Sequence, residues 1–109
     1  MAKKLPSGAQ RIAKRHPAVW DAFAKLGEAA AAAGPLDEKT RRLVKLALAI
    51  GLGSEGGVHS HARRAVAEGV SVEELQHVSL LAVPSLGLAS AARALSWIED
   101  ITTKPEKKK

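Results

Sequence analysis

The sequence contains no cysteine and no tyrosine, and it has only one phenylalanine and two tryptophans. The absence of cysteine excludes disulfides, thiolate metal ligands and thiol catalysis within this chain. The scarcity of aromatic and β-branched runs argues against a sheet. No apolar run free of charges approaches about 18 residues, and the first six residues lack the apolar core of a secretion signal. We therefore expect a cytoplasmic helical protein without a membrane span.

The net charge of +6 is distributed unevenly along the chain. Residues 1–16 carry five basic and no acidic residues, residues 104–109 have a net charge of +3, and residues 17–103 have a net charge of −2. Basic segments can hold nucleic acid by counterion release, but these contain no aromatic side chain to stack on bases. We therefore expect a basic N-terminal segment (1–16), one folded domain (17–103) and a basic, solvated C-terminal tail (104–109). Nucleic acid is not an expected partner.

Glycine, proline and serine divide the chain into helical segments with short connections. Pro17 suits a first helical position, Ser54 a helix cap and Gly69 a left-handed helix end, while Ser71 and Glu74 match a capping box. The expected helices span residues 7–15, 17–33, 38–51, 54–68, 71 to about 84, and a last segment to about 101. Pro84 either kinks the fifth helix or separates it from the sixth. The fold class that follows is all-α, a single-domain bundle of five to six helices.

Apolar residues at three- and four-residue steps predict which helix faces are buried. In the second helix, Val19, Phe23, Leu26 and Ala30 form such a core stripe. The central helix, residues 38–51, is apolar on more sides than one small chain can cover. Because exposed apolar surface of that size normally marks an interface, we expect a homo-oligomer.

The segment from Gly53 to Ala65 holds the densest group of functional side chains. Three glycines, a carboxylate and two histidines lie where a helix begins. His61 falls on the inward face, as either a hydrogen-bonded core histidine or a functional group. His59 points away from His61 and shares a face with Glu55 and Arg63. Glu55 and His59 form either a surface ion pair or part of a site for a divalent metal or a pocket between subunits. Two ligands from one chain do not make a closed metal site.

The order of these elements resembles the carboxymuconolactone decarboxylase and alkylhydroperoxidase D-like superfamily over about residues 17–100. The strings that carry the resemblance are His16–Trp20, Gly34–Arg41, Gly51–Ala65 and Glu68–Leu75. Together, at these spacings, they imply the alkylhydroperoxidase D-like helical scaffold. The resemblance also implies closed homo-oligomers, trimers or hexamers.

The redox branch of this superfamily carries Cys-x-x-Cys-x-x-x-His, with a glutamate completing a proton relay. At the corresponding positions this chain has Ser54, Gly57 and His61, and Arg42 stands at the place of the glutamate. Only the histidine matches. Because peroxide reduction by that chemistry needs a thiolate, the resemblance implies a scaffold without thiol peroxidase activity.

The decarboxylase branch acts without a cofactor on a lactone derived from muconate and keeps a histidine where His61 stands. The resemblance therefore implies a lyase or isomerase of a small unsaturated acid or lactone, with His61 as general acid or base because histidine titrates near neutrality. Arg42 and Arg64 are candidates to bind the substrate carboxylate through two guanidinium N–H groups. Ser54 and Gly57 are further candidate substrate-binding residues. The alternative is a non-catalytic member of the fold that binds a small ligand or serves as an oligomeric scaffold.

Overall fold

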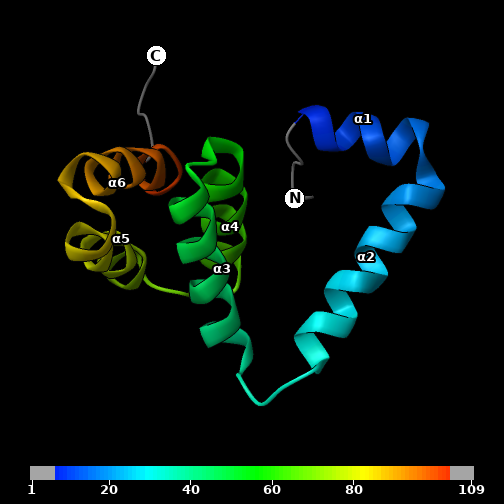
Figure 1. The fold of residues 1–109 in the computed structure, drawn as a ribbon, viewed down its shortest axis with the longest axis horizontal. Coiled ribbons are helices and arrows are strands. Elements are labelled where there is room, and N and C mark those ends of the chain that lie inside the picture. The colour runs from blue at the N-terminus through cyan, green and yellow to red at the C-terminus, as the bar shows by residue number, and fades with distance from the viewer. Residues whose placement is uncertain (1–6, 104–109) are drawn as a thin grey trace. The chain divides into compact units, whose positions relative to one another are not determined.

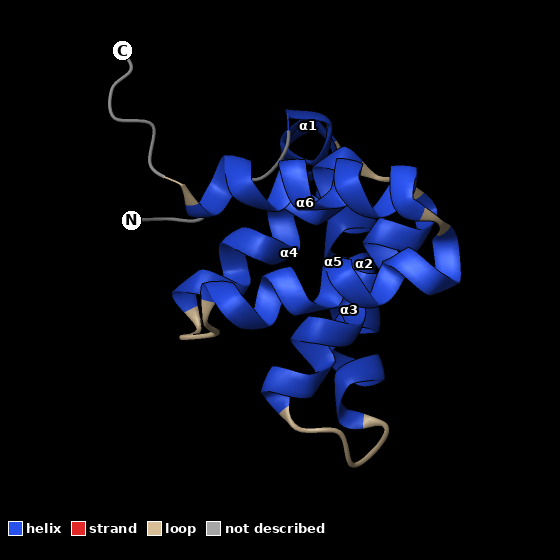
Figure 2. Ribbon diagram, turned by 90° about the vertical axis from the view of Figure 1, so that its left-hand side faces the viewer, coloured by secondary structure: helices blue, strands red, loops and turns tan. Residues whose placement is uncertain are grey.

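The computed structural model describes residues 7–103, and these contain helices, turns and loops but no strand (Figure 2). Their helices are α1 (Ser7–Arg15), α2 (Pro17–Ala32), α3 (Glu38–Leu52), α4 (Glu55–Ala67), α5 (Val72–Leu86) and α6 (Leu88–Thr102). The all-α prediction is confirmed. Residues 1–6 and the predicted tail at 104–109 lie outside the described residues. None of the described helices is both long enough and apolar enough to cross a membrane.

The chain forms two compact units, one ending at Asp37 and the other beginning at Glu38. The first unit contains α1 and α2 (Figure 1). Pro17 opens α2 as predicted. No residue of α2 is buried, and the predicted core residues Val19, Phe23 and Leu26 are 61%, 60% and 66% exposed. Within the unit formed by α1 and α2, the predicted stripe on α2 is therefore not buried, and the prediction is wrong for that unit. The physical reason is that α1 is short, polar and itself exposed at Ile12.

The second unit is a four-helix bundle in which α4 packs against α3 and α6, and α5 packs against the same two helices (Figure 1). Leu46 of α3, Leu75 of α5 and Ile98 of α6 are fully buried at its centre. Small residues make up much of the buried surface of α4 and α6, which pack against each other. The buried alanines of these two helices are Ala62, Ala65, Ala91 and Ala94. This packing fixes the positions of the side chains on α3, α4 and α6 relative to one another.

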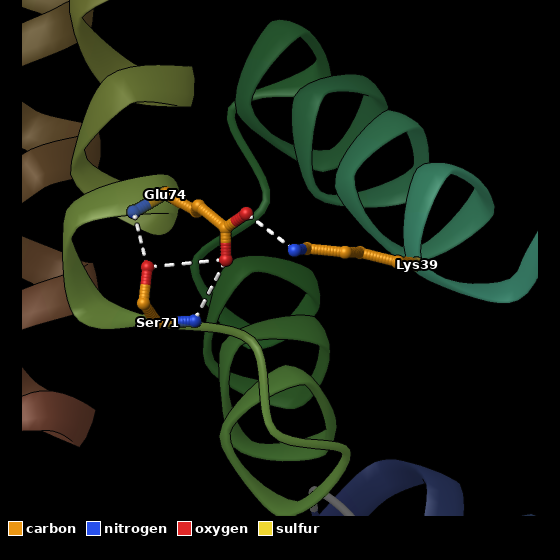
Figure 3. A network of polar contacts seen from close by, with 3 residues as sticks. All are labelled: Lys39, Ser71 and Glu74. Carbon is orange, nitrogen blue, oxygen red and sulfur yellow. Dashed lines mark hydrogen bonds and ion pairs between the residues drawn. The ribbon is translucent and has the colours of Figure 1, made fainter.

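Local hydrogen bonds set the helix boundaries in this unit. The Ser54 hydroxyl accepts from the Gly57 N–H at 2.9 Å at the start of α4, and Gly69 follows α4 with a φ of 90°. The Ser71 hydroxyl accepts from the Glu74 N–H at 3.1 Å, while the Glu74 carboxylate accepts from the Ser71 N–H at 2.9 Å (Figure 3). The same carboxylate pairs with Lys39 of α3, which ties the start of α5 to α3. The caps and the capping box predicted from the sequence are confirmed.

The boundary between α5 and α6 lies later than Pro84. Pro84 is inside α5, which continues to Leu86, and the chain turns at Gly87 with a φ of 103°. A proline removes one helical hydrogen bond, but the positive φ that ends the helix is readily adopted only by glycine. The sequence left two roles open for Pro84, a kink in the fifth helix or the boundary with the sixth. Pro84 is not the boundary, because α5 continues past it.

Candidate functional site

Arg42, His61 and Glu68 form a connected polar group between α3 and α4. Arg42 lies on α3, His61 on α4, and Glu68 is the residue that follows α4. The Nε and Nη2 of Arg42 each donate to one oxygen of Glu68 at 3.0 Å, and its Nη1 lies 2.9 Å from the Nδ1 of His61. The bidentate pair holds the guanidinium plane in one orientation, so the third contact positions the imidazole as well.

The contact with Arg42 fixes which nitrogen of His61 carries the proton. A guanidinium has only donors, so the Nδ1 of His61 must accept the hydrogen bond. Nδ1 therefore has no proton, and a neutral imidazole then carries its proton on Nε2. The structure thus presents His61 as a hydrogen-bond donor through Nε2–H.

The surroundings of His61 disfavour its charged form. Partial burial is the largest cause, and the positive charges of Arg42, Arg64 and Lys45 add to it, so the pKa falls from 6.5 to about 4. The negative charge of Glu68 opposes this shift but does not cancel it. The acid/base hypothesis assumed a pKa near neutrality, whereas the lowered pKa leaves almost no imidazolium at pH 7 to act as a general acid.

A hollow of about 320 Å³ lies beside this group. It is lined by Lys45, Leu48, Ala49, Leu52, Ser54, Gly57 and His61. Among the predicted site residues, Ser54, Gly57 and His61 line it, whereas Arg42 and Arg64 do not. The wall is mostly apolar, with one cationic side chain and the imidazole, a combination that suits a small molecule bearing a carboxylate.

Gly57 has a steric role at this hollow. A Cβ built at residue 57 would lie 2.8 Å from the Ser54 hydroxyl oxygen and 3.1 Å from the Cβ of Ala49. The glycine therefore allows α4 to begin close against α3 while the Ser54 cap stays in place. The structure brings together the two positions that correspond to the cysteines of the redox branch, and in this chain they form a helix cap.

Sequence reasoning missed Glu68 and Lys45. Glu68 lies seven residues, or two helical turns, after His61, and Lys45 lies three residues after Arg42 on α3. These spacings place Glu68 on the helix face of His61, and Lys45 on the helix face of Arg42. The sequence spacing could therefore have indicated both residues. The sequence suggested that Arg42 binds a substrate carboxylate through two N–H groups. In the structure, its Nε and Nη2 donate to the carboxylate of Glu68 instead.

A separate group forms where the start of α4 meets the end of α6. The Nε2 of His59 lies 2.9 Å from the Oδ2 of Asp100, and one ligand atom from each of Glu55, His59 and Asp100 lies within 4.8 Å of the other two. The sequence predicted Glu55 and His59 together but not Asp100, which is 41 residues from His59. Because α4 already begins at Glu55, the two histidines diverge, and His61 belongs to a different site.

A larger hollow of about 630 Å³ lies between α3 and α5. Its walls are mainly the apolar residues Leu43, Val44, Val78, Leu81 and Leu86. It contains no lysine or arginine and none of the predicted site residues. The smaller hollow, where the imidazole and a cation meet, is therefore the better candidate for a site that binds an acidic molecule.

Sequence comparison relates the chain to known proteins. A sequence model of the carboxymuconolactone decarboxylase family matches residues 17–100. An uncharacterized protein of Methanocaldococcus jannaschii is 28% identical over 102 residues, which cover 93% of this chain and 95% of that protein. No solved structure gave a significant match. The chain therefore belongs to the carboxymuconolactone decarboxylase family.

Proposed function

We propose that the hollow beside His61 binds a small unsaturated acid or lactone and that the protein acts on it as a cofactor-independent decarboxylase or isomerase. The observation that carries this proposal is the state of His61. Its Nδ1 is held by Arg42, it is neutral at pH 7, and it lines a hollow that also contains Lys45. Membership of the family supports the same class of reaction.

The proposed chemistry uses His61 as a neutral donor. Lys45 attracts the substrate carboxylate, and Leu48 and Leu52 provide an apolar wall for the carbon skeleton of the substrate. In a decarboxylation, the bond to the departing CO2 breaks and its electron pair moves into an enolate. The Nε2–H of His61 donates to the enolate oxygen, and a proton from water then completes the carbon. Donors placed where charge develops stabilise the transition state, and a neutral imidazole among cations is a known form of such a donor.

Arg42 and Glu68 act on this chemistry through His61. Their bidentate pair orients the guanidinium, which holds the imidazole in the tautomer with its proton on Nε2. We assign Arg42 and Glu68 as positioning residues. Ser54 and Gly57 shape the end of the hollow, and the Ser54 hydroxyl accepts from Gly57 while keeping its own proton to donate to a ligand.

A ligand and activity panel tests the proposal. Wild type, His61→Ala and His77→Ala are each incubated with unsaturated lactones and with keto and enol acids, while binding and CO2 release are followed. His77 is an exposed histidine outside this hollow, so its variant is the matched control. We expect one ligand class to bind and turnover to fall about 100- to 1,000-fold in His61→Ala only, the usual effect of removing one such donor. If no member binds, or if both variants behave alike, the proposal fails.

The second candidate function is an oligomeric scaffold, and the exposed apolar faces favour it. Phe23 and Leu26 on α2 are 60% and 66% exposed, and Leu48 on α3 is 66% exposed. Covering the part of these side chains that is still exposed would be favourable by roughly 1–2 kcal/mol each. We propose that further copies of the chain cover these faces in a trimer or a pair of trimers.

Sedimentation equilibrium at micromolar concentration tests this assembly. Wild type should give a multiple of the 11.4 kDa chain mass. Phe23→Asp should shift the distribution toward the monomer, because it places a charge on the apolar face. Lys25→Asp, on an exposed position of the same helix, is the control and should leave the mass unchanged. A wild-type mass equal to one chain would reject the assembly.

A further inference from the structure

Glu55, His59 and Asp100 are distinct from the hollow beside His61, and the proposed function does not use them. We propose that these three side chains bind one divalent transition-metal ion of the Zn²⁺ type. Their ligand atoms lie within 4.8 Å of one another, and they come from two helices that are far apart in sequence. Neither membership of the family nor the proposed function gives these three residues a role.

The packing of α4 against α6 preorganises the three ligands. Glu55 and His59 are separated by one helical turn on α4, and Asp100 reaches them from α6 two residues after the fully buried Ile98. Around a tetrahedral ion with bonds of about 2.0–2.2 Å, ligand atoms lie roughly 3.3–3.6 Å apart. Rotation of the two carboxylate side chains would bring the three ligand atoms to this spacing.

The charges at this place favour a cation. The two carboxylates of Glu55 and Asp100 approach within 4.8 Å, so their repulsion is relieved when a positive ion lies between them. The His59 side chain is only 22% exposed, which limits competition from bulk water at its Nε2. One metal ion with two carboxylates gives a neutral group.

The donor set indicates which ions fit. One imidazole nitrogen with two carboxylate oxygens matches Zn²⁺ and its neighbours in the first transition series, whereas Mg²⁺ and Ca²⁺ prefer oxygen ligands alone. Three protein ligands leave at least one position open for water or for a small anion. The site is therefore a binding site with an exchangeable position, unlike a closed structural zinc site.

Metal titration of the full chain tests this inference. Metal-free wild type is titrated with ZnCl2 by calorimetry and with CoCl2 by visible absorption, which reports low-coordinate Co²⁺. We expect one ion per chain, a visible Co²⁺ band, and at least a tenfold weaker affinity in His59→Gln, Glu55→Gln and Asp100→Asn. Glu99→Gln is the matched control, because Glu99 is exposed beside Asp100 and its change removes the same charge. Its affinity should equal that of wild type.

Folding is checked by far-UV circular dichroism, and the 53% exposure of the Asp100 side chain makes Asp100→Asn the variant most certain to fold. Zn²⁺ should raise the thermal midpoint of wild type and of Glu99→Gln but not that of Asp100→Asn. Absence of saturable binding below 100 μM Zn²⁺ would overturn the inference. So would binding that the three ligand variants leave unchanged, because the ion would then be held elsewhere. His61→Ala should keep its metal affinity, which separates this test from that of the proposed function.

Discussion

The lowered pKa of His61 predicts how the stability of the protein depends on pH. The folded-state pKa is about 4, whereas the unfolded chain has the ordinary value of 6.5. Between these values the unfolded chain binds a proton that the folded chain does not. The contribution of His61 to stability is therefore fully present above pH 6.5 and is lost progressively as the pH falls toward 4.

The magnitude follows from the size of the shift. A difference of about 2.5 pH units would correspond to about 3.4 kcal/mol if the whole shift were expressed in stability. The side chain is only partly buried, so solvent screens the neighbouring charges of Arg42, Arg64 and Lys45. We expect an acid-dependent loss of about 1–2 kcal/mol in the free energy of unfolding between pH 7 and pH 4.

Urea unfolding of wild type, His61→Gln and His77→Gln at pH values from 7.5 to 4 measures this loss. Carboxylates titrate in the same range in all three proteins, so the contribution of His61 is the difference in slope between wild type and His61→Gln. The exposed His77 is the control, and its variant should follow wild type. In parallel, ¹⁵N chemical shifts should show the His61 ring neutral and protonated on Nε2 at pH 6. A midpoint of 6 or above for His61, or parallel pH profiles for wild type and His61→Gln, would refute the reasoning.

Three further predictions concern the same helices. Arg42→Gln should raise the pKa of His61, because it removes a cation that disfavours the imidazolium, and an unchanged NMR titration midpoint would contradict this. Ser71→Ala should lower the free energy of unfolding by about 1 kcal/mol through loss of the capping box, as measured in urea, and a change below about 0.3 kcal/mol would count against it. The unmodified chain should show no thiol-dependent hydroperoxide reduction. The double variant Ser54→Cys with Gly57→Cys should not gain full peroxidase activity, because Arg42 stands where the proton relay needs a glutamate. Full turnover of this variant in a peroxidase assay would show that the reasoning fails.

The helices and their ends could be predicted from the sequence because their causes are local. The hydrogen bond from the Gly57 N–H to the Ser54 hydroxyl and the capping box at Ser71 and Glu74 each join residues three positions apart. The positive φ of Gly69 depends on the absence of a side chain at that residue. The exclusion of thiol chemistry also needs only the composition. Pro84 is the exception, since its position alone did not show that α5 continues past it.

The burial of helix faces could be predicted only in part. Leu46, Leu75 and Ile98 are buried because the four helices of the second unit pack around them. The apolar stripe of α2 has the same periodicity, yet Phe23 is 60% exposed. Periodicity identifies the apolar side of a helix. It does not identify what covers that side, which depends on the other helices or on other copies of the chain.

The chemistry of the candidate sites was decided by tertiary packing. From the sequence, His61 was a histidine at a family position with an ordinary pKa. Its neutral state and its tautomer depend on Arg42, 19 residues away, whose orientation depends in turn on Glu68. Asp100 likewise joins His59 across 41 residues. Electrostatic interactions act through space and strengthen as water is excluded, so the sequence determined which groups were present and the packing of α3, α4 and α6 determined what those groups can do.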